Sequence, residues 1–197
     1  MKKGEETKAR LVAASGKLLQ QVGYRGAALK EVLRESGAPR GSLYFHFPGG
    51  KDELVALALT TTAEQWKARL EAVLDSEPEL DAAIAAVCEA LAAEMERSEF
   101  RNGCPLATAT LEAAADNDAV QEVSERHYRD WEQAIAARLR AHGVGETGAA
   151  EFARFCLAAI EGALLLARAY RDVSPLRDTA RMLALSAGAL SSRDTEG

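Results

Sequence analysis

One short stretch decides the fold of this chain: residues 36–47 read SGAPRGSLYFHF. Gly37 stands where a helix would end, because glycine readily adopts the left-handed backbone of a helix C-terminus. Pro39 follows two residues later and suits the first turn of a new helix, where a missing N–H costs no hydrogen bond. The flanking residues 28–36 and 40–47 have the apolar spacing of two short helices. Two short helices joined by a tight glycine-containing turn are typical of a helix-turn-helix, whose second helix enters the major groove of DNA.

The second of these helices has the side chains that DNA contacts require. Leu43 and Phe47 lie four residues apart and can face the core, which leaves most other positions outside. An arginine such as Arg40 donates to guanine or phosphate, while serine, tyrosine and histidine can donate to phosphate oxygens. A glycine lets the backbone come close, and a lysine beside the free N–H groups of the next helix adds an anion-binding point. The predicted DNA-binding residues are Lys30, Arg40, Gly41, Ser42, Tyr44, Phe45, His46 and Lys51.

Charge is divided unevenly along the 197 residues. The whole chain has a net charge of −6, which by itself argues against nucleic acid as a partner. Residues 1–60, however, carry ten basic and six acidic side chains, whereas the remainder carries 14 and 24. A basic N-terminal part suits a polyanion, and an acidic remainder would be repelled by it. We therefore expect only the N-terminal part to contact DNA.

Apolar periodicity is helical almost throughout, and no convincing stretch alternates with the period of a β-strand. The predicted fold class is therefore all-α, with about nine helices. We expect a three-helix helix-turn-helix domain over residues 1–50 and a larger helical domain over residues 51–197, bridged by the helix that begins at Lys51. The helices are predicted over residues 7–22, 28–36, 40–47, 51–75, 79–97, 105–115, 118–141, 148–171 and 175–191.

Further motifs lie on both sides of the two short helices. They are Gly23-Tyr24, residues 29–33 (LKEVL) and residues 51–54 (KDEL). Together with residues 36–47, these motifs resemble the N-terminal domain of the TetR family of transcriptional regulators. The resemblance implies a regulator, by family tendency a repressor, that binds a double-stranded palindromic operator as a homodimer and is released by a small-molecule effector. It also implies that residues 51–197 form a ligand-binding and dimerisation domain.

Two departures from the family pattern are present. Ala27-Ala28 stands where the family usually has Thr or Ser, so the second helix lacks an N-cap hydroxyl worth about 1 kcal/mol. The break between Phe47 and Lys51 is one residue longer than usual. Its Phe-Pro-Gly-Gly-Lys sequence and the downstream Gly103-Cys104-Pro105-Leu106 resemble the branch that includes drug- and flavonoid-responsive repressors of efflux genes. This similarity implies a lipophilic or aromatic effector.

The helix over residues 152–170 is apolar on nearly every side. Its charges, Arg154, Glu161 and Arg168, recur every seven residues and form one narrow stripe. Such a helix is buried on more than one face, by its own core and, we expect, by the same helix of a second subunit in a four-helix contact. A core helix of a single chain is the alternative. The predicted interface residues are Ala159, Gly162, Ala163, Leu166, Ala167, Met182 and Leu185.

Large apolar side chains of the C-terminal part could line a cavity for the effector, although the same residues would suit a plain core. His127 lies on an apolar helix face and could donate to a ligand; the alternative is a core histidine bonded to a backbone carbonyl. Cys104 precedes Pro105 at a helix start and could be a thiol of low pKa or a small buried side chain. The predicted ligand-binding residues are Trp66, Leu70, Cys104, His127, Trp131, Phe152 and Phe155.

Other classes of protein fit the sequence less well. The three histidines form no catalytic motif and no glycine-rich phosphate loop is present, so no enzyme, cofactor or metal is predicted. Two alternatives stay open: the same DNA-binding head with a redox or metal sensor built from Cys88, Cys104, Cys156 and His127, and a dimeric interaction module without DNA.

Uncharged runs are too short for a membrane span. Three cysteines without disulfide spacing favour the cytoplasm.

Overall fold

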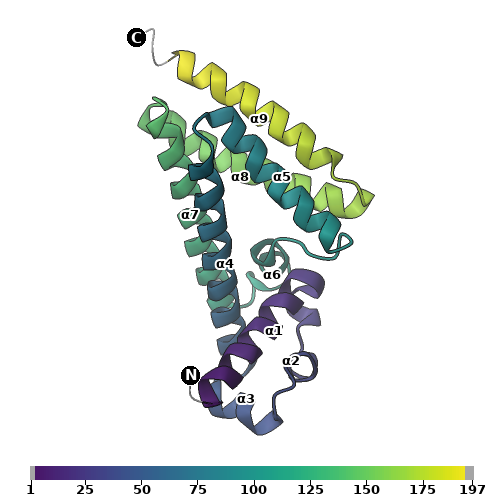
Figure 1. Ribbon diagram of the computed structural model, residues 1–197. Helices are drawn as coiled ribbons and strands as arrows, with labels where there is room; N and C mark the ends of the chain where they lie inside the picture. The colour runs from purple at the N-terminus through teal and green to yellow at the C-terminus, as the bar shows by residue number, and fades with distance from the viewer. Residues whose placement is uncertain (1–2, 194–197) are drawn as a thin grey trace. The chain divides into compact units, whose positions relative to one another are not determined.

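The computed structural model describes residues 3–193, which form helices joined by short connections (Figure 1). The all-α prediction is confirmed, with nine helices among the described residues. They are α1 (Lys3–Gly26), α2 (Leu29–Ser36), α3 (Arg40–His46), α4 (Lys51–Ser76), α5 (Leu80–Arg97), α6 (Pro105–Ala113), α7 (Asp118–Ala141), α8 (Glu146–Tyr170) and α9 (Ser174–Arg193). Residues 1–2 and 194–197, which the predicted domains include, lie outside the described range.

Local sequence accounts for the ends of the first three helices. α2 ends at Gly37, whose φ of 62° lies in the left-handed region that glycine tolerates best. Pro39 precedes α3 with a φ of −62°, the value that its ring imposes. α1 is interrupted at Gly23, whose φ of 72° and ψ of −173° are not helical. The predicted stop at Gly23 thus marks a real break, and the helical turn continues beyond it to Gly26.

The contacts divide the chain into two compact units. The first unit comprises residues 3–65 and 104–127, with α1 packed against α2, α3 and α6 (Figure 1). Its core contains side chains that are at most 1% exposed: Leu11, Leu19, Val32, Leu43, Phe47, Leu54 and Leu106. Burial of one such side chain contributes about 1.5–3 kcal/mol. The short helices α2 and α3 are therefore held by packing against α1 more than by their own few hydrogen bonds.

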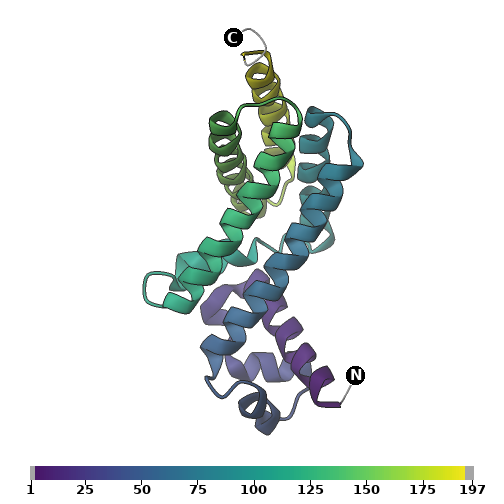
Figure 2. The same ribbon diagram turned by 90° about the vertical axis from the view of Figure 1, so that its left-hand side faces the viewer.

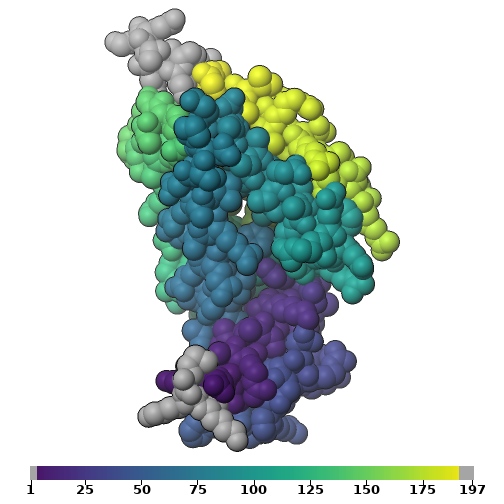
Figure 3. All heavy atoms as spheres, in the orientation of Figure 1, coloured from purple at the N-terminus to yellow at the C-terminus, as the bar shows by residue number. Residues whose placement is uncertain are grey.

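The second unit comprises residues 66–103 and 128–193, and its helices α5, α8 and α9 pack on one another. α9 runs along α5 in Figure 3, and α8 lies beside α9 in Figure 2. A buried cluster joins these helices to the end of α7 and includes Ile84, Leu139, Phe152, Cys156 and Leu183. One face of each helix is used by this core, and the other faces of α8 and α9 remain exposed within the unit.

These two units are defined by contacts and do not coincide with the predicted domains, which divide the chain by function after residue 50. The functional division stays a prediction. α6 and the first parts of α4 and α7 belong to the same unit as the helix-turn-helix. In the part of the chain that the structure describes, no helix has an apolar stretch long enough to cross a bilayer.

Candidate DNA interface and ligand cavity

α3 presents a polar and aromatic surface outside the core. Leu43 and Phe47 anchor the helix, at 0% and 1% exposure. Tyr44, by contrast, is 50% exposed and Phe45 is 80% exposed. The residues that lie outside the core, exposed or half-buried, are Arg40, Gly41, Ser42, Tyr44, Phe45 and His46. The structure thus brings the predicted DNA-binding residues of this helix together on its outer side.

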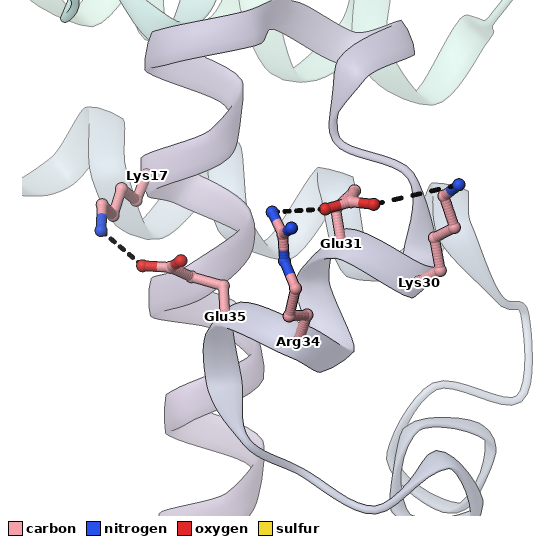
Figure 4. A network of polar contacts seen from close by, with 5 residues as sticks. All are labelled: Lys17, Lys30, Glu31, Arg34 and Glu35. Carbon is pink, nitrogen blue, oxygen red and sulfur yellow. Dashed lines mark hydrogen bonds and ion pairs between the residues drawn. The ribbon is translucent and has the colours of Figure 1, made fainter.

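Opposite charges pair along α2 (Figure 4). The Glu31 carboxylate lies 2.5 Å from the Arg34 guanidinium and 4.0 Å from the Lys30 ammonium. Glu35 accepts a hydrogen bond from Lys17 of α1, which lowers the pKa of the Glu35 carboxyl. Exposed pairs of this kind contribute about 0–1 kcal/mol each. The Lys30 and Arg34 side chains are 84% and 75% exposed, so both can exchange Glu31 for a DNA phosphate at little cost.

Lys51 is directed toward the end of α1. Its ammonium group donates to the carbonyl oxygen of Tyr24 over 2.7 Å and lies 3.9 Å from the centroid of the Tyr24 ring. The Tyr24 hydroxyl donates to Asp52 over 2.6 Å, and the Asn117 amide donates to the same carboxylate oxygen over 2.9 Å. Burial lowers the pKa of Lys51 and raises that of Tyr24. Lys51 thus holds the end of α1 to the start of α4, and its role in DNA binding stays a prediction.

A second set of contacts holds α6 against the same end of α1. The Arg25 backbone N–H donates to the Glu112 carboxylate over 2.8 Å, and the Thr108 hydroxyl donates to the Leu19 carbonyl oxygen over 2.8 Å. A side chain at Gly23 would collide with Glu112, since its Cβ would lie 2.4 Å from a carboxylate oxygen. Gly23 is therefore favoured by its positive φ of 72°, and a larger residue here would also force the Glu112 carboxylate to move. Together these contacts fix α1, against which the two short helices pack.

Replacement of Gly41 by alanine should separate folding from DNA binding. Nothing lies within 4 Å of the position that a Cβ would occupy at Gly41, so the free protein can accept the methyl group. Alanine favours a helix over glycine by up to about 1 kcal/mol, and the melting temperature should stay constant or rise. Where α3 enters a DNA groove, the same methyl group meets the DNA. Operator affinity should fall about tenfold or more, because overpacking a close contact costs about 1–3 kcal/mol.

Thermal unfolding and fluorescence anisotropy with a labelled operator measure these two effects. Gly148→Ala in α8 is the matched control, because its Cβ would meet Val144 at an ordinary 3.5 Å. The control should leave operator affinity unchanged. If Gly41→Ala binds the operator as tightly as the unaltered protein, α3 does not approach DNA through this position.

A cavity of about 220 Å³ lies within the second unit. Trp66 and Trp131 line it and stack on each other, with ring centroids 6.2 Å apart and planes inclined by 17°. Tyr128 meets the Trp131 ring edge to face. The lining residues are Trp66, Arg69, Leu70, Val73, Val87, Ala90, Leu91, Glu94, Arg97, Trp131, Ile135, Leu157, Ile160, Glu161 and Leu164. Walls made of flat aromatic rings and aliphatic side chains suit a planar apolar molecule.

Three of the charged side chains at the cavity, Glu94, Arg97 and Glu161, have partners within the protein. Glu94 accepts a hydrogen bond from the Asn102 amide over 2.8 Å and forms an ion pair with Arg97. Glu161 accepts a hydrogen bond from the Tyr128 hydroxyl over 3.2 Å. These groups can orient a ligand through hydrogen bonds, while the apolar walls provide most of the contact area.

The predicted ligand-binding residues separate into two groups. Those that line the cavity are Trp66, Leu70 and Trp131. The other four do not line it. Cys104 and His127 are each 3% exposed and belong to the first unit. Phe152 lies in the core of the second unit, whereas Phe155 points outward and is 55% exposed.

Sequence reasoning missed the wall of the cavity that α5 contributes. Val87, Leu91 and Glu94 recur at helical spacing, which a plain core helix would also show. Glu94 and Arg97 near the end of this apolar helix are the one signal that could have drawn attention to it.

Large apolar side chains gather on the outer faces of α8 and α9. Leu165, Leu185 and Met182 are 64%, 66% and 59% exposed. The predicted interface residues that lie at this surface, exposed or half-buried, are Ala159, Gly162, Leu166, Met182 and Leu185. Ala163 and Ala167 differ, since they are 3% and 0% exposed and face the core of their own subunit. The reason is helical geometry, because both lie on the opposite side of α8 from Leu165.

The cysteine thiols of this chain are buried. Cys88 and Cys156 are 1% and 3% exposed, and Cys104 is 3% exposed. Burial raises the pKa of Cys88 to about 11 and that of Cys156 to about 12, so both are neutral thiols near pH 7 and poor nucleophiles. Among residues 3–190, no three His, Cys, Asp or Glu side chains group closely enough to hold a metal ion. No observation therefore favours the redox or metal sensor over the small-molecule sensor.

Known proteins match this chain over both of its parts. Residues 11–58 match the family described as bacterial regulatory proteins, tetR family, and residues 81–182 match the C-terminal domain of LmrA/YxaF-like transcriptional regulators. The chain belongs to the TetR family. The family match over residues 11–58 confirms the resemblance of the helix-turn-helix motifs. TetR-family proteins are DNA-binding transcriptional regulators without enzymatic activity.

Individual TetR relatives cover nearly the whole chain. The regulator LmrA of Bacillus subtilis (strain 168) is 29% identical over 171 residues, which cover 87% of this chain and 91% of LmrA. The uncharacterized regulator Rv0196 of Mycobacterium tuberculosis (strain ATCC 25618 / H37Rv) is 33% identical over 172 residues, covering 85% and 87% of the two chains. The crystal structure of a TetR regulator from Chloroflexus aurantiacus is 27% identical and superposes with a TM-score of 0.78, over 94% of this chain and 96% of that one.

Proposed function

We propose that this TetR-family regulator is a ligand-responsive repressor, which binds a palindromic operator as a homodimer and is released by a lipophilic or aromatic effector. The observation that carries the proposal is the outer surface of α3, where Arg40, Tyr44 and Phe45 are exposed while Leu43 and Phe47 hold the helix in the core. Such a regulator acts where bacterial DNA lies, in the cytoplasm.

The DNA-binding residues divide by chemistry into base readers and phosphate contacts. Arg40 is suited to the O6 and N7 acceptors of guanine in the major groove. Tyr44 and His46 of α3, with Lys30 of α2, are suited to phosphate oxygens, which fix the position of the helix without reading sequence. Lys51 has a positioning role, because its ammonium group is hydrogen-bonded to the end of α1.

The exposed apolar face of α8 and α9 supports the dimer. Leu165, Met182 and Leu185 are each more than half exposed in the single chain, and they lie on two helices that pack on each other. Several large exposed apolar side chains of this kind are typical of an interface. A two-fold axis through this face would place the same residues opposite one another in a four-helix contact. The dimer would then present two α3 helices, which must lie about 34 Å apart to enter successive major-groove turns.

The cavity supports the effector part of the proposal, and α4 supports a route from the cavity to DNA. α4 begins at Lys51, which holds α1, and carries Trp66 and Leu70 of the cavity wall. A ligand that binds more tightly to one conformation of the cavity increases the population of dimers with that conformation. In these dimers the two α3 helices have a spacing that no longer fits the operator. Operator affinity then falls, and the regulated gene is expressed.

Binding of the purified protein to its own upstream region tests the regulator against the interaction module without DNA. Footprinting should reveal a protected site with two-fold symmetry, and the affinity should fall steeply as the salt concentration rises. Binding that is absent at low salt, or equal for unrelated DNA of the same length, would contradict a sequence-specific regulator.

Tryptophan fluorescence should report directly on the cavity. The chain has two tryptophans, Trp66 and Trp131, and both line this cavity. A planar aromatic probe such as a flavonoid should therefore quench the emission in a saturable way, because it stacks against the rings. Leu70→Phe narrows the cavity and should weaken the binding, and Phe155→Ala on the outer face of α8 should leave it unchanged. Equal probe affinity in both variants would place the ligand elsewhere.

A further inference from the structure

Phe45 is a large apolar residue whose side chain contributes nothing to the core. Its side chain is 80% exposed on α3, while Leu43 on the same helix and Phe47 at its C-cap are buried. At 3.6 residues per turn, Phe45 lies about 180° round the helix from the midpoint between those two core residues. It therefore points directly away from the core, and its ring packs edge to face on the neighbouring His46, with centroids 5.0 Å apart.

The helix surface around Phe45 is shaped for close approach. Gly41 and Ser42 lie four and three residues before it and thus share its side of the helix. Neither has a bulky side chain, and nothing lies within 4 Å of a Cβ at Gly41. The phenyl ring consequently stands beside two small residues, and at 80% exposure it is more exposed than the neighbouring Tyr44 ring at 50%.

A phenyl ring can recognise one feature of the major groove. It has no hydrogen-bond donor or acceptor, so it cannot read the N7, O6, N6 or N4 groups of the base edges. The apolar group in that groove is the C5 methyl of thymine. We propose that Phe45 is a specificity-determining residue that contacts a thymine methyl, so that each half-site of the operator contains a thymine under this ring. The proposal rests on the proposed function, in which α3 enters the major groove.

Replacement of thymine by deoxyuracil tests this contact, because uracil lacks the methyl group and keeps every pairing and hydrogen-bonding group. In the operator found by footprinting, each thymine of one half-site is replaced in turn, and affinity is measured by fluorescence anisotropy. At one position the affinity of the unaltered protein should fall about fourfold, and about 15-fold when both half-sites are changed, as expected for the loss of one buried methyl group at each. Phe45→Ala should bind the thymine operator more weakly and bind the thymine and uracil operators equally. Phe45→Leu, which keeps an apolar side chain, should retain part of the discrimination.

Leu111→Ala is the matched control, because Leu111 of α6 is 83% exposed and lies outside α3. It should discriminate thymine from uracil as the unaltered protein does. If no uracil replacement changes the affinity, or if Phe45→Ala discriminates as well as the unaltered protein, the thymine contact is wrong while the proposed function stands. If the unaltered protein binds no DNA in a sequence-specific way, the proposed function and this inference both fail.

Discussion

Arg40→Ala should reduce operator affinity by about 30-fold to 2 × 10⁴-fold without changing the fold or the dimer. Arg40 begins α3 and is exposed, so no core contact is lost with its side chain. A guanidinium group that contacts a guanine contributes about 1–3 kcal/mol of discrimination, and a two-fold dimer makes the contact twice. The combined loss of about 2–6 kcal/mol corresponds to the stated fold-change. Fluorescence anisotropy at fixed salt measures it, and size-exclusion chromatography with light scattering checks the dimer.

Arg101→Ala separates this effect from a general loss of positive charge. Arg101 has a side chain that is 70% exposed and pairs with Glu99 in the connection after α5. Its removal changes the net charge by the same amount, and operator affinity should change by less than about threefold. If Arg40→Ala binds as tightly as Arg101→Ala, the assignment of α3 as the recognition helix has to be abandoned.

Local chemistry explains why the helix-turn-helix could be predicted in detail. Gly37 and Pro39 fix the turn by their own backbone preferences, and Leu43 and Phe47 fix the buried side of α3 by their spacing. None of these arguments needs information from distant parts of the chain. The same holds for the helix boundaries, which differ from the predicted ones mostly by one or two residues, at frayed or kinked ends such as that of α1.

Residues whose roles depend on distant contacts could not be placed from the sequence. Lys51 turns toward Tyr24 because α1 ends beside the start of α4, and no spacing along the chain shows this. Phe152 and Phe155 lie three residues apart and would share a helix face, yet one is in the core and the other is exposed. Periodicity gives the spacing of apolar residues, whereas neighbouring helices decide which edge of an apolar face is covered.

Periodicity also failed to separate core residues from interface residues on α8. The predicted interface included Ala163 and Ala167, which the subunit buries in its own core. A sharper test of the interface therefore uses residues that the single chain leaves exposed. Leu185 is such a residue, being 66% exposed on α9 beside Met182, which is 59% exposed. Its replacement leaves the core of the unit untouched.

Leu185→Asp should convert the dimer into a folded monomer and reduce operator affinity by more than about 100-fold. An isologous interface would bury the new carboxylate twice, and an unpaired charge in an apolar contact costs several kcal/mol. A monomer keeps one recognition helix and loses the gain in effective concentration that comes from linking two half-site contacts. Sedimentation velocity measures the first effect, anisotropy with a labelled operator measures the second, and an unchanged thermal unfolding profile at low concentration excludes misfolding.

The matched control is Leu111→Asp, which places the same charge on an even more exposed leucine of α6, outside the α8 and α9 face. It should remain dimeric and bind the operator normally. A Leu185→Asp protein that stays dimeric would show that another surface joins the subunits. A monomer that still binds the full operator with unchanged affinity would show that one recognition helix is sufficient. The proposed effector control would then fail, because release by a changed spacing of the two α3 helices requires both half-sites to be bound at once.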